Sequence, residues 1–209
     1  MKQVLVLLAD WANGLFALLA AAWLLEVTIL WWHIPVALLL SHLPDIDAIP
    51  ELLRRGKVSA SQEHSQDHRT LLHYPIISLP ICVSLALYGG YWGLVIATVI
   101  PLHLFNDLYG TGWGLQLFWP LGRRHYKLLG RRVNRLRHML TEEEQTVLPA
   151  SETGLRVIVS WNDEELPAYI KKWGMDNWIE PWYLKLNWIN GIEYGLFLIA
   201  CILMVLVVM

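Results

Sequence analysis

Charged residues are scarce in this sequence. Lys, Arg, Asp and Glu make up 16% of its 209 residues, whereas a soluble domain usually carries about 25%. Hydrophobic residues account for 56%, and the mean hydropathy is +0.41. The shortage of charge, together with long apolar runs, argues against a soluble globular domain and indicates an integral membrane protein.

Cysteine and several catalytic motifs are also scarce or absent. The two cysteines, Cys82 and Cys201, both lie inside apolar runs, which argues against a disulfide framework or a zinc knuckle. There is no glycine-rich phosphate loop and no Ser–His–Asp motif in a supporting context. A cleavable signal peptide is not expected, because only Lys2 is basic before the first apolar run and no small-residue cleavage site follows.

The apolar runs predict an all-α, polytopic membrane protein with about five membrane helices, some of them short. The expected helices cover residues 12–25, 35–44, 74–88, 91–108 and 192–209. The second has only about ten residues, too few to cross a hydrocarbon layer of roughly 30 Å. The expected division is a membrane core with the site at 1–125, a small cytoplasmic insert at 126–189, and a C-terminal transmembrane helix at 190–209. Within the insert, residues 155–161 alternate as a strand does.

Basic residues are confined to one side of this topology. All 16 Lys and Arg residues fall in the segments 1–11, 43–73 and 109–189, which the topology places on one membrane face. Because cytoplasmic loops carry the excess of Lys and Arg, that face is predicted to be cytoplasmic. The expected location is the cytoplasmic (inner) membrane of a bacterium or archaeon, with the N-terminus on the cytoplasmic side.

Three clusters of metal-ligand residue types stand at the ends of apolar runs on this same face. They comprise Asp45 and Asp47; His64, Asp67, His68 and His73; and His103 and Asp107. Each has a plainer explanation: a helix-ending turn, a histidine-rich interfacial loop, and a hydrogen-bond network between helices, respectively. Ionisable groups at the edge of a membrane span are costly to desolvate, however, which makes them candidates for function.

Taken together, the three clusters predict a divalent metal site that opens on the cytoplasmic face. The predicted ligands are Asp45, Asp47, His68, His73, His103 and Asp107, with His42 and His64 as further candidates. Mixed imidazole and carboxylate donors favour zinc over calcium, with manganese and iron as alternatives. For catalysis, Glu63 or Asp67 is a candidate general base, and Arg69 is a candidate to contact a substrate phosphate.

The segment 122–137 carries seven Lys and Arg residues interleaved with leucine, valine and tyrosine. This pattern predicts an interfacial helix that contacts anionic lipid headgroups through residues 123–137. A sharper alternative is that one or two of its arginines bind a substrate phosphate. Nucleic acid is not an expected partner, because no nucleic-acid-binding motif accompanies the charge.

Several of these motifs, in this order, resemble one known family. They are Trp31-Trp32-His33-Ile34, Leu43-Pro44-Asp45-Ile46-Asp47, His68-Arg69-x-x-x-His73, His103-x-x-x-Asp107 and Phe118-Trp119-Pro120-Leu121. The combination resembles the YdjM-type proteins, described as LexA-binding, inner-membrane-associated, metal-dependent hydrolases. The resemblance covers roughly residues 10 to 125 and implies a hydrolase without naming its substrate.

The sequence departs from that family's pattern at three places. Asn13 and Ala48 stand where the family commonly has histidines, and His68-Arg69-Thr70-Leu71-Leu72-His73 replaces the usual His-Arg-Gly-x-Thr-His. His42 and His64 lie close enough to act as replacements. Either the ligand set has been rearranged, or one of two metal positions has been lost.

The expected function is metal-dependent hydrolysis of a membrane lipid or a lipid-linked substrate. A phosphoester is favoured because Arg69 and the basic segment lie on the same face as the site. Alternatives are an intramembrane lipid amidase and a non-enzymatic membrane protein with a structural metal site. An ion transporter is disfavoured, because Glu26 and His33 are the only ionisable residues expected on the far side.

Overall fold

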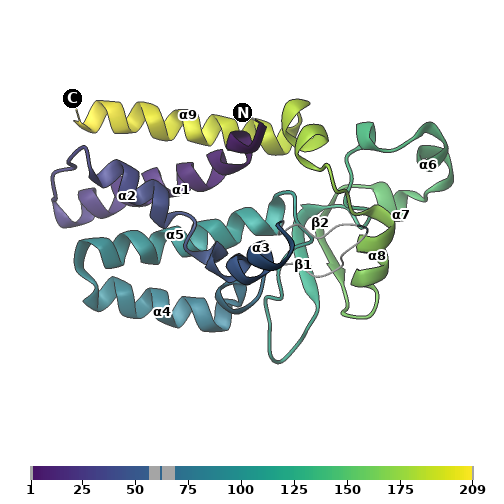
Figure 1. The fold of residues 1–209 in the computed structure, drawn as a ribbon, viewed down its shortest axis with the longest axis horizontal. Helices are drawn as coiled ribbons and strands as arrows, with labels where there is room; N and C mark the ends of the chain where they lie inside the picture. The colour runs from purple at the N-terminus through teal and green to yellow at the C-terminus, as the bar shows by residue number, and fades with distance from the viewer. Residues whose placement is uncertain (1, 57–61, 63–68, 209) are drawn as a thin grey trace.

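The computed structural model describes residues 2–56, 62 and 69–208. Its longer helices lie side by side, and smaller elements gather beyond one end of them (Figure 1). The helices of this bundle are α1 (Lys2–Leu25), α2 (His33–Leu40), α4 (Pro75–Tyr88), α5 (Gly90–Tyr109) and α9 (Trp188–Val208). Short helical segments link α2 to α4: η1 (Pro44–Ala48), α3 (Ile49–Arg55) and η2 (Leu71–His73).

The remaining elements form what we call the cap, residues 110–187. Its strands are β1 (His125–Gly130) and β2 (Arg156–Trp161), and its helical elements are η3 (Arg137–Met139), α6 (Glu142–Val147), α7 (Ala150–Thr153), α8 (Leu166–Trp173) and the π-helical turn η4 (Glu180–Leu184). The two strands pair antiparallel, from His125 opposite Trp161 to Gly130 opposite Arg156. The strand expected at 155–161 is therefore present, and the expectation of a purely α-helical fold is wrong in this one respect.

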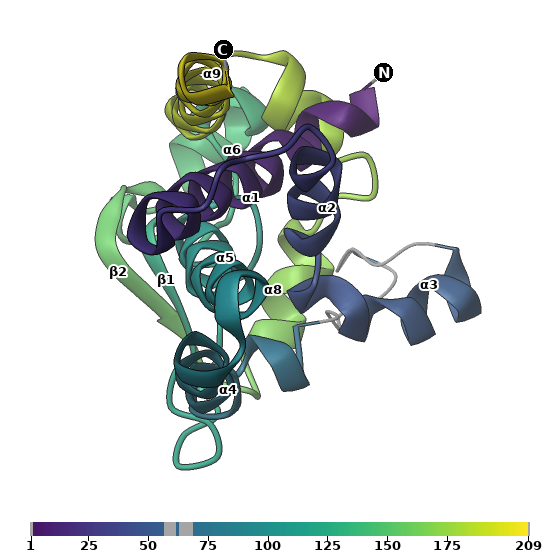
Figure 2. The ribbon, with the colours of Figure 1, turned by 90° about the vertical axis from the view of Figure 1, so that its left-hand side faces the viewer.

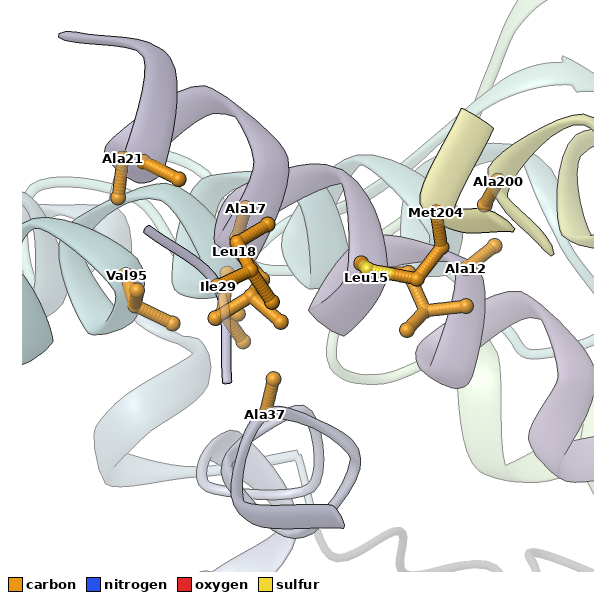
Figure 3. Packing of buried hydrophobic residues seen from close by; sticks show 12 residues of the cluster. Ala12, Leu15, Ala17, Leu18, Ala21, Ile29, Ala37, Val95, Ala200 and Met204 are labelled. Atoms are coloured by element: carbon orange, nitrogen blue, oxygen red, sulfur yellow. The ribbon is translucent and has the colours of Figure 1, made fainter. Parts of the chain in front are cut away.

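Helix α1 is the central helix of the bundle. It packs against α2, α5 and α9, as the end-on view in Figure 2 shows. Its contact surface is built largely from alanine, and Ala12, Ala17 and Ala21 are almost completely buried. Figure 3 shows these residues facing Ala37, Val95, Ala200 and Met204 of the neighbouring helices. Small side chains let helices approach closely, which is how helices associate in a membrane.

Three of the bundle helices, α1, α5 and α9, are long and apolar enough to cross a membrane. Helix α4 is apolar but shorter, and α2 has only eight residues. By this criterion three of the roughly five expected membrane helices have the length and composition of membrane spans. A position within the membrane for α2 and α4 stays a prediction.

The basic segment does not form the expected helix. Residues 125–130 form strand β1, because they pair along their length with strand β2, which is rich in β-branched residues. The neighbouring arginines bind within the cap: Arg124 donates to Ser160 Oγ at 3.0 Å, and Arg132 lies 3.2 Å from Glu165 Oε2. Contact of 123–137 with anionic lipid stays a prediction, but it now concerns a strand and its flanking loops.

A buried lysine ties this strand to the loop that follows α5. Lys127 donates to Gly112 O at 2.8 Å and to Asn134 Oδ1 at 2.6 Å. Burial lowers the pKa of the Lys127 amine well below its usual range. Asn134 in turn donates to Thr111 O and Gly112 O. These bonds fix the backbone at 111–112, which lies next to the predicted metal ligands.

Candidate metal centre

The predicted ligands in the described residues come from three short structural contexts. Asp45 and Asp47 lie on the 3₁₀ turn η1, whose first residue is Pro44, a position that suits proline because no N–H is needed there. His73 ends η2 and precedes Tyr74-Pro75, where the proline forces an extended backbone before α4. His103 and Asp107 lie one turn apart on α5, and so face the same way.

The structure brings four donor atoms from these elements together. His73 Nε2 lies 3.3 Å from Asp107 Oδ2 and 3.7 Å from Asp45 Oδ1. His103 Nε2 lies 3.4 Å from Asp45 Oδ1 and 3.8 Å from Asp107 Oδ2. The two imidazole nitrogens and the two carboxylate oxygens therefore alternate around a ring with edges of 3.3–3.8 Å.

Each imidazole is held from behind by another carboxylate. His73 Nδ1 hydrogen-bonds Asp47 Oδ2 at 3.0 Å, and His103 Nδ1 lies 2.9 Å from Asp10 Oδ1. Asp47 is itself positioned by the backbone N–H and the hydroxyl of Thr70, at 3.1 and 3.3 Å. A carboxylate on one ring nitrogen fixes the tautomer and leaves the other nitrogen as the ligand atom, as in carboxylate–histidine–zinc sites.

These residues fit a divalent metal. Ligand atoms around a zinc ion with bonds of about 2.0–2.2 Å lie roughly 3.3–3.6 Å apart, close to the edges of the ring, and Asp45, His73 and His103 offer ligand atoms that all lie within 4.8 Å of one another. His103 Nε2 and Asp107 Oδ2 are buried and form no hydrogen bond with the described residues. Because buried polar atoms are normally satisfied, this pair indicates a ligand beyond the described residues. Zinc suits two imidazoles and two carboxylates.

The charge of the cluster also fits a cation. Burial alone would lower the pKa of His73, but its contacts with Asp107, Asp45 and Asp47 raise the pKa to about 10. Without a metal, this imidazole therefore keeps a proton at neutral pH and balances part of the carboxylate charge. A metal that binds at Nε2 replaces that proton, as is usual for histidine ligands.

The remaining predicted site residues divide into three groups. Glu63, His64, Asp67 and His68 lie outside the described residues, so their predicted roles stay predictions. His42 lies beside the cluster: its Nδ1 is 3.8 Å from Asp10 Oδ2, and Asp10, His42 and Asp45 offer ligand atoms within 4.8 Å of one another. Arg69 binds Asp107 Oδ1 through a guanidinium nitrogen at 2.6 Å, and so contacts a predicted ligand.

The guanidinium of Arg69 fits against a glycine. A Cβ at Gly112 would overlap Arg69, so only glycine leaves room for the Arg69–Asp107 ion pair. We expect Gly112→Ala to displace the flexible end of Arg69 from Asp107 and so to destabilise the protein by about 1–3 kcal/mol, the cost of leaving a buried polar partner unsatisfied. Thermal unfolding in detergent measures this effect.

The matched control is Gly195→Ala in α9, because a Cβ at Gly195 would meet no atom within 4 Å. Equal melting temperatures for the two variants would show that Arg69 is not confined by Gly112.

A cavity of about 330 Å³ opens beside the cluster. Its polar lining comes from the bundle helices and the segments that link α2 to α4, and its aromatic lining comes from the cap. The polar residues are Asp10, Asp45, Arg69, His103, Asp107 and Glu193; the aromatic residues are Trp113, Trp173, Trp178, Trp182 and Tyr183. A mostly apolar pocket with a few convergent polar groups is the usual form of a small-molecule site.

Two acidic residues of this site were not predicted from the sequence. Asp10 interrupts the first apolar run and Glu193 the last, which was expected to be uninterrupted from residue 192 onward. Glu193 is the only charged residue in α9 and is 2% exposed. An isolated charge within an apolar span is a signal of function, and it would have identified both residues.

Comparison with known proteins finds a matching family. The family model of the YdjM inner membrane protein matches residues 11–209. The match extends past the motifs noted in the sequence and includes the cap and α9. No curated protein and no solved structure matches the chain. With 199 of its 209 residues matched, the chain belongs to the YdjM inner membrane protein family.

Proposed function

We propose that this protein is a metal-dependent hydrolase of the cytoplasmic membrane, acting on a lipid or lipid-linked substrate at the cytoplasmic face. The observation that carries the proposal is the ring of four donor atoms, with edges of 3.3–3.8 Å, beside an aromatic-walled cavity. In this proposal His73, His103, Asp107 and Asp45 hold one zinc ion. When bound, such an ion supplies Lewis acidity and lowers the pKa of a bound water.

The residues around the ring have distinct proposed roles. Asp47 and Asp10 orient the two imidazoles, and Arg69 holds the far oxygen of Asp107 so that Oδ2 faces the site. The side chain of Asp45 is 32% exposed, whereas that of His73 is fully buried. Asp45 therefore forms the side of the ring that substrate and water reach. The remaining carboxylates and imidazoles are shielded from solvent and keep their geometry.

Support for a lipid substrate comes from the position of the cavity. Its lining includes Val6, Leu7 and Ala9 of α1, a helix long and apolar enough to cross a membrane. The cap covers the other side with aromatic rings, which suit the boundary between membrane and water. A polar headgroup can therefore reach the ring while its chain stays in apolar surroundings. A phosphoester remains our first choice of bond, because Arg69 lines the cavity and guanidinium groups bind phosphate well.

Lipid analysis of cells tests this function. Cells that carry His103→Ala in place of the wild-type chain should accumulate one lipid class and lose its hydrolysis product. The variant His33→Ala serves as a control, because His33 is also buried but lies at the start of α2 and accepts a hydrogen bond from Leu30 N. Identical lipid profiles for wild type and His103→Ala would contradict the proposal.

One observation favours a second candidate, a structural metal site. All four donors come from the protein, and the two histidine side chains are 0% and 5% exposed. Closed four-ligand sites of this kind are usually structural, whereas catalytic zinc keeps a position for water. If the site is structural, His103→Ala lowers the amount of folded protein. The lipid profile of the cells, compared at equal levels of folded protein, is then the same as for wild type. The lipid comparison, normalised to protein level, therefore separates the two functions.

The proposed orientation has its own test. We expect Arg54→Cys, a surface position in α3, to be shielded from a membrane-impermeant maleimide in intact cells and to react after lysis. Tyr88→Cys, at the α4–α5 turn at the other end of the bundle, should react in intact cells, because Tyr88 is 86% exposed. Both changes are made in a chain with Cys82→Ser and Cys201→Ser. Labelling in the opposite order would invert the topology.

A further inference from the structure

Glu193 carries a buried carboxyl group that has no role in the proposed metal site. It is 2% exposed, and its Oε2 atom has no hydrogen-bond partner among the described residues. It lies on α9, a helix long and apolar enough to cross a membrane. A charged group in such a position is costly, and those that persist usually serve a function.

The position of Glu193 links it to the metal centre. A Cβ at Gly110 would lie 3.8 Å from Glu193 Oε1, and Gly110 follows Asp107 by three residues at the end of α5. Glu193 and four members of the centre, Asp10, Asp45, His103 and Asp107, line the same cavity. This cavity has a volume of about 330 Å³, within the usual range for small-molecule sites, and both Glu193 and the ring border it.

The carboxyl of Glu193 faces acidic and phenolic side chains. Among the described residues these include Asp10 from α1, Tyr109 from α5, Tyr183 from η4, and Tyr194 next to it in α9. None of these side chains becomes positively charged. A negative charge on a buried carboxyl is costly where the neighbouring groups are acidic or neutral, so such surroundings favour the neutral form. Tyr183 contacts the same carboxyl and orients it from the cap side.

From this geometry we infer that Glu193 is the proton donor to the leaving group of the substrate. The inference rests on the proposed hydrolase function and adds a residue to it. In the step, the bond between phosphorus and the leaving oxygen breaks, and the Glu193 proton passes to that oxygen to give a neutral alcohol. The attacking water, on the opposite side of phosphorus, supplies its hydroxyl to phosphorus and releases its second proton to solvent, from which the Glu193 carboxylate takes up a proton again. Atoms and charges balance without any further reactant.

The first test is chemical labelling, which does not depend on activity. A hydrophobic carbodiimide such as dicyclohexylcarbodiimide adds to protonated carboxyl groups in apolar surroundings. With the full-length, zinc-loaded protein in detergent at neutral pH, mass spectrometry should find the adduct at Glu193. Exposed Glu143 of α6 should remain unmodified. An unmodified Glu193 under these conditions would overturn the inference whether or not the protein proves to be a hydrolase.

The second test compares leaving groups with Glu193→Gln. Hexanol needs a proton to leave hexyl phosphate, whereas nitrophenolate leaves 4-nitrophenyl phosphate without one. Because general acid catalysis contributes about 10²–10⁴-fold, the variant should lose at least about 100-fold on the first ester and less than about tenfold on the second. The control Glu143→Gln should match wild type on both. Equal losses on the two esters would indicate a structural role and overturn the inference. If wild type hydrolyses neither ester, the phosphoester proposal fails and the labelling result alone decides whether Glu193 is a protonated, reachable carboxyl.

Discussion

Replacement of His73 or His103 with alanine is expected to abolish metal binding. Each histidine contributes an Nε2 atom to the ring of donors, and each has its other nitrogen beside a carboxylate. Loss of one imidazole leaves too few donors for a four-coordinate site. Elemental analysis of protein purified in detergent should find about one zinc per wild-type chain and less than roughly a tenth in either variant.

The control for this result is a histidine of equal burial in another place. His33, at the start of α2, is 5% exposed and packs against Trp32, Tyr91 and Trp92 rather than against carboxylates. His33→Ala is expected to lower stability through lost packing and to keep its zinc. Size-exclusion chromatography and circular dichroism confirm that each variant is folded. Full zinc occupancy in folded His73→Ala and His103→Ala would refute the ligand assignment.

A second large effect is expected from the different positions of two neighbouring aspartates, which the sequence did not distinguish. Asp45 and Asp47 form one motif, yet Asp45 lies on the ring, whereas Asp47 binds the Nδ1 atom of His73. Asp47→Asn and Asp10→Asn should therefore weaken zinc binding by about 10–100-fold, the usual cost of losing a carboxylate behind a histidine ligand. Competition with a fluorescent zinc chelator measures these affinities. The isosteric control Asp163→Asn, in the cap, should bind zinc as wild type does.

The contrast with Asp45 makes this prediction specific. Asp45→Asn removes a direct donor, so its affinity should fall further than that of Asp47→Asn. A larger loss for Asp47→Asn than for Asp45→Asn would reverse the roles given to the two carboxylates. Unchanged affinity for Asp10→Asn would show that its contact with His103 Nδ1 has no bearing on the metal.

The sequence allowed the membrane helices and the clustering of ligands to be predicted. Apolar runs are a strong signal because a helix in lipid needs a length set by the bilayer. The position of His103 and Asp107 one turn apart on such a helix also follows from sequence alone. Their proximity to Asp45 could be predicted only from the assigned topology, because no local sequence pattern links α5 to η1.

Other features depended on tertiary contacts that the sequence does not reveal. The basic segment was expected to be a helix because basic and apolar residues are interleaved in it, but its pairing with β2 made it a strand. A strand-like alternation was evident only in the partner. Similarly, the separation of Asp45 from Asp47 reflects the tight turn of η1, which directs the two carboxylates to opposite sides of the His73 ring. Asp10 was overlooked because its partner His103 lies 93 positions further along the chain.

The most direct test of the central claim is X-ray absorption spectroscopy at the zinc edge on the zinc-loaded, full-length protein. The proposed zinc site predicts two imidazole nitrogens and two carboxylate oxygens as protein ligands, at about 2.0–2.2 Å from zinc. Sulfur ligands, or a shell of oxygens alone without an imidazole signal, would contradict it.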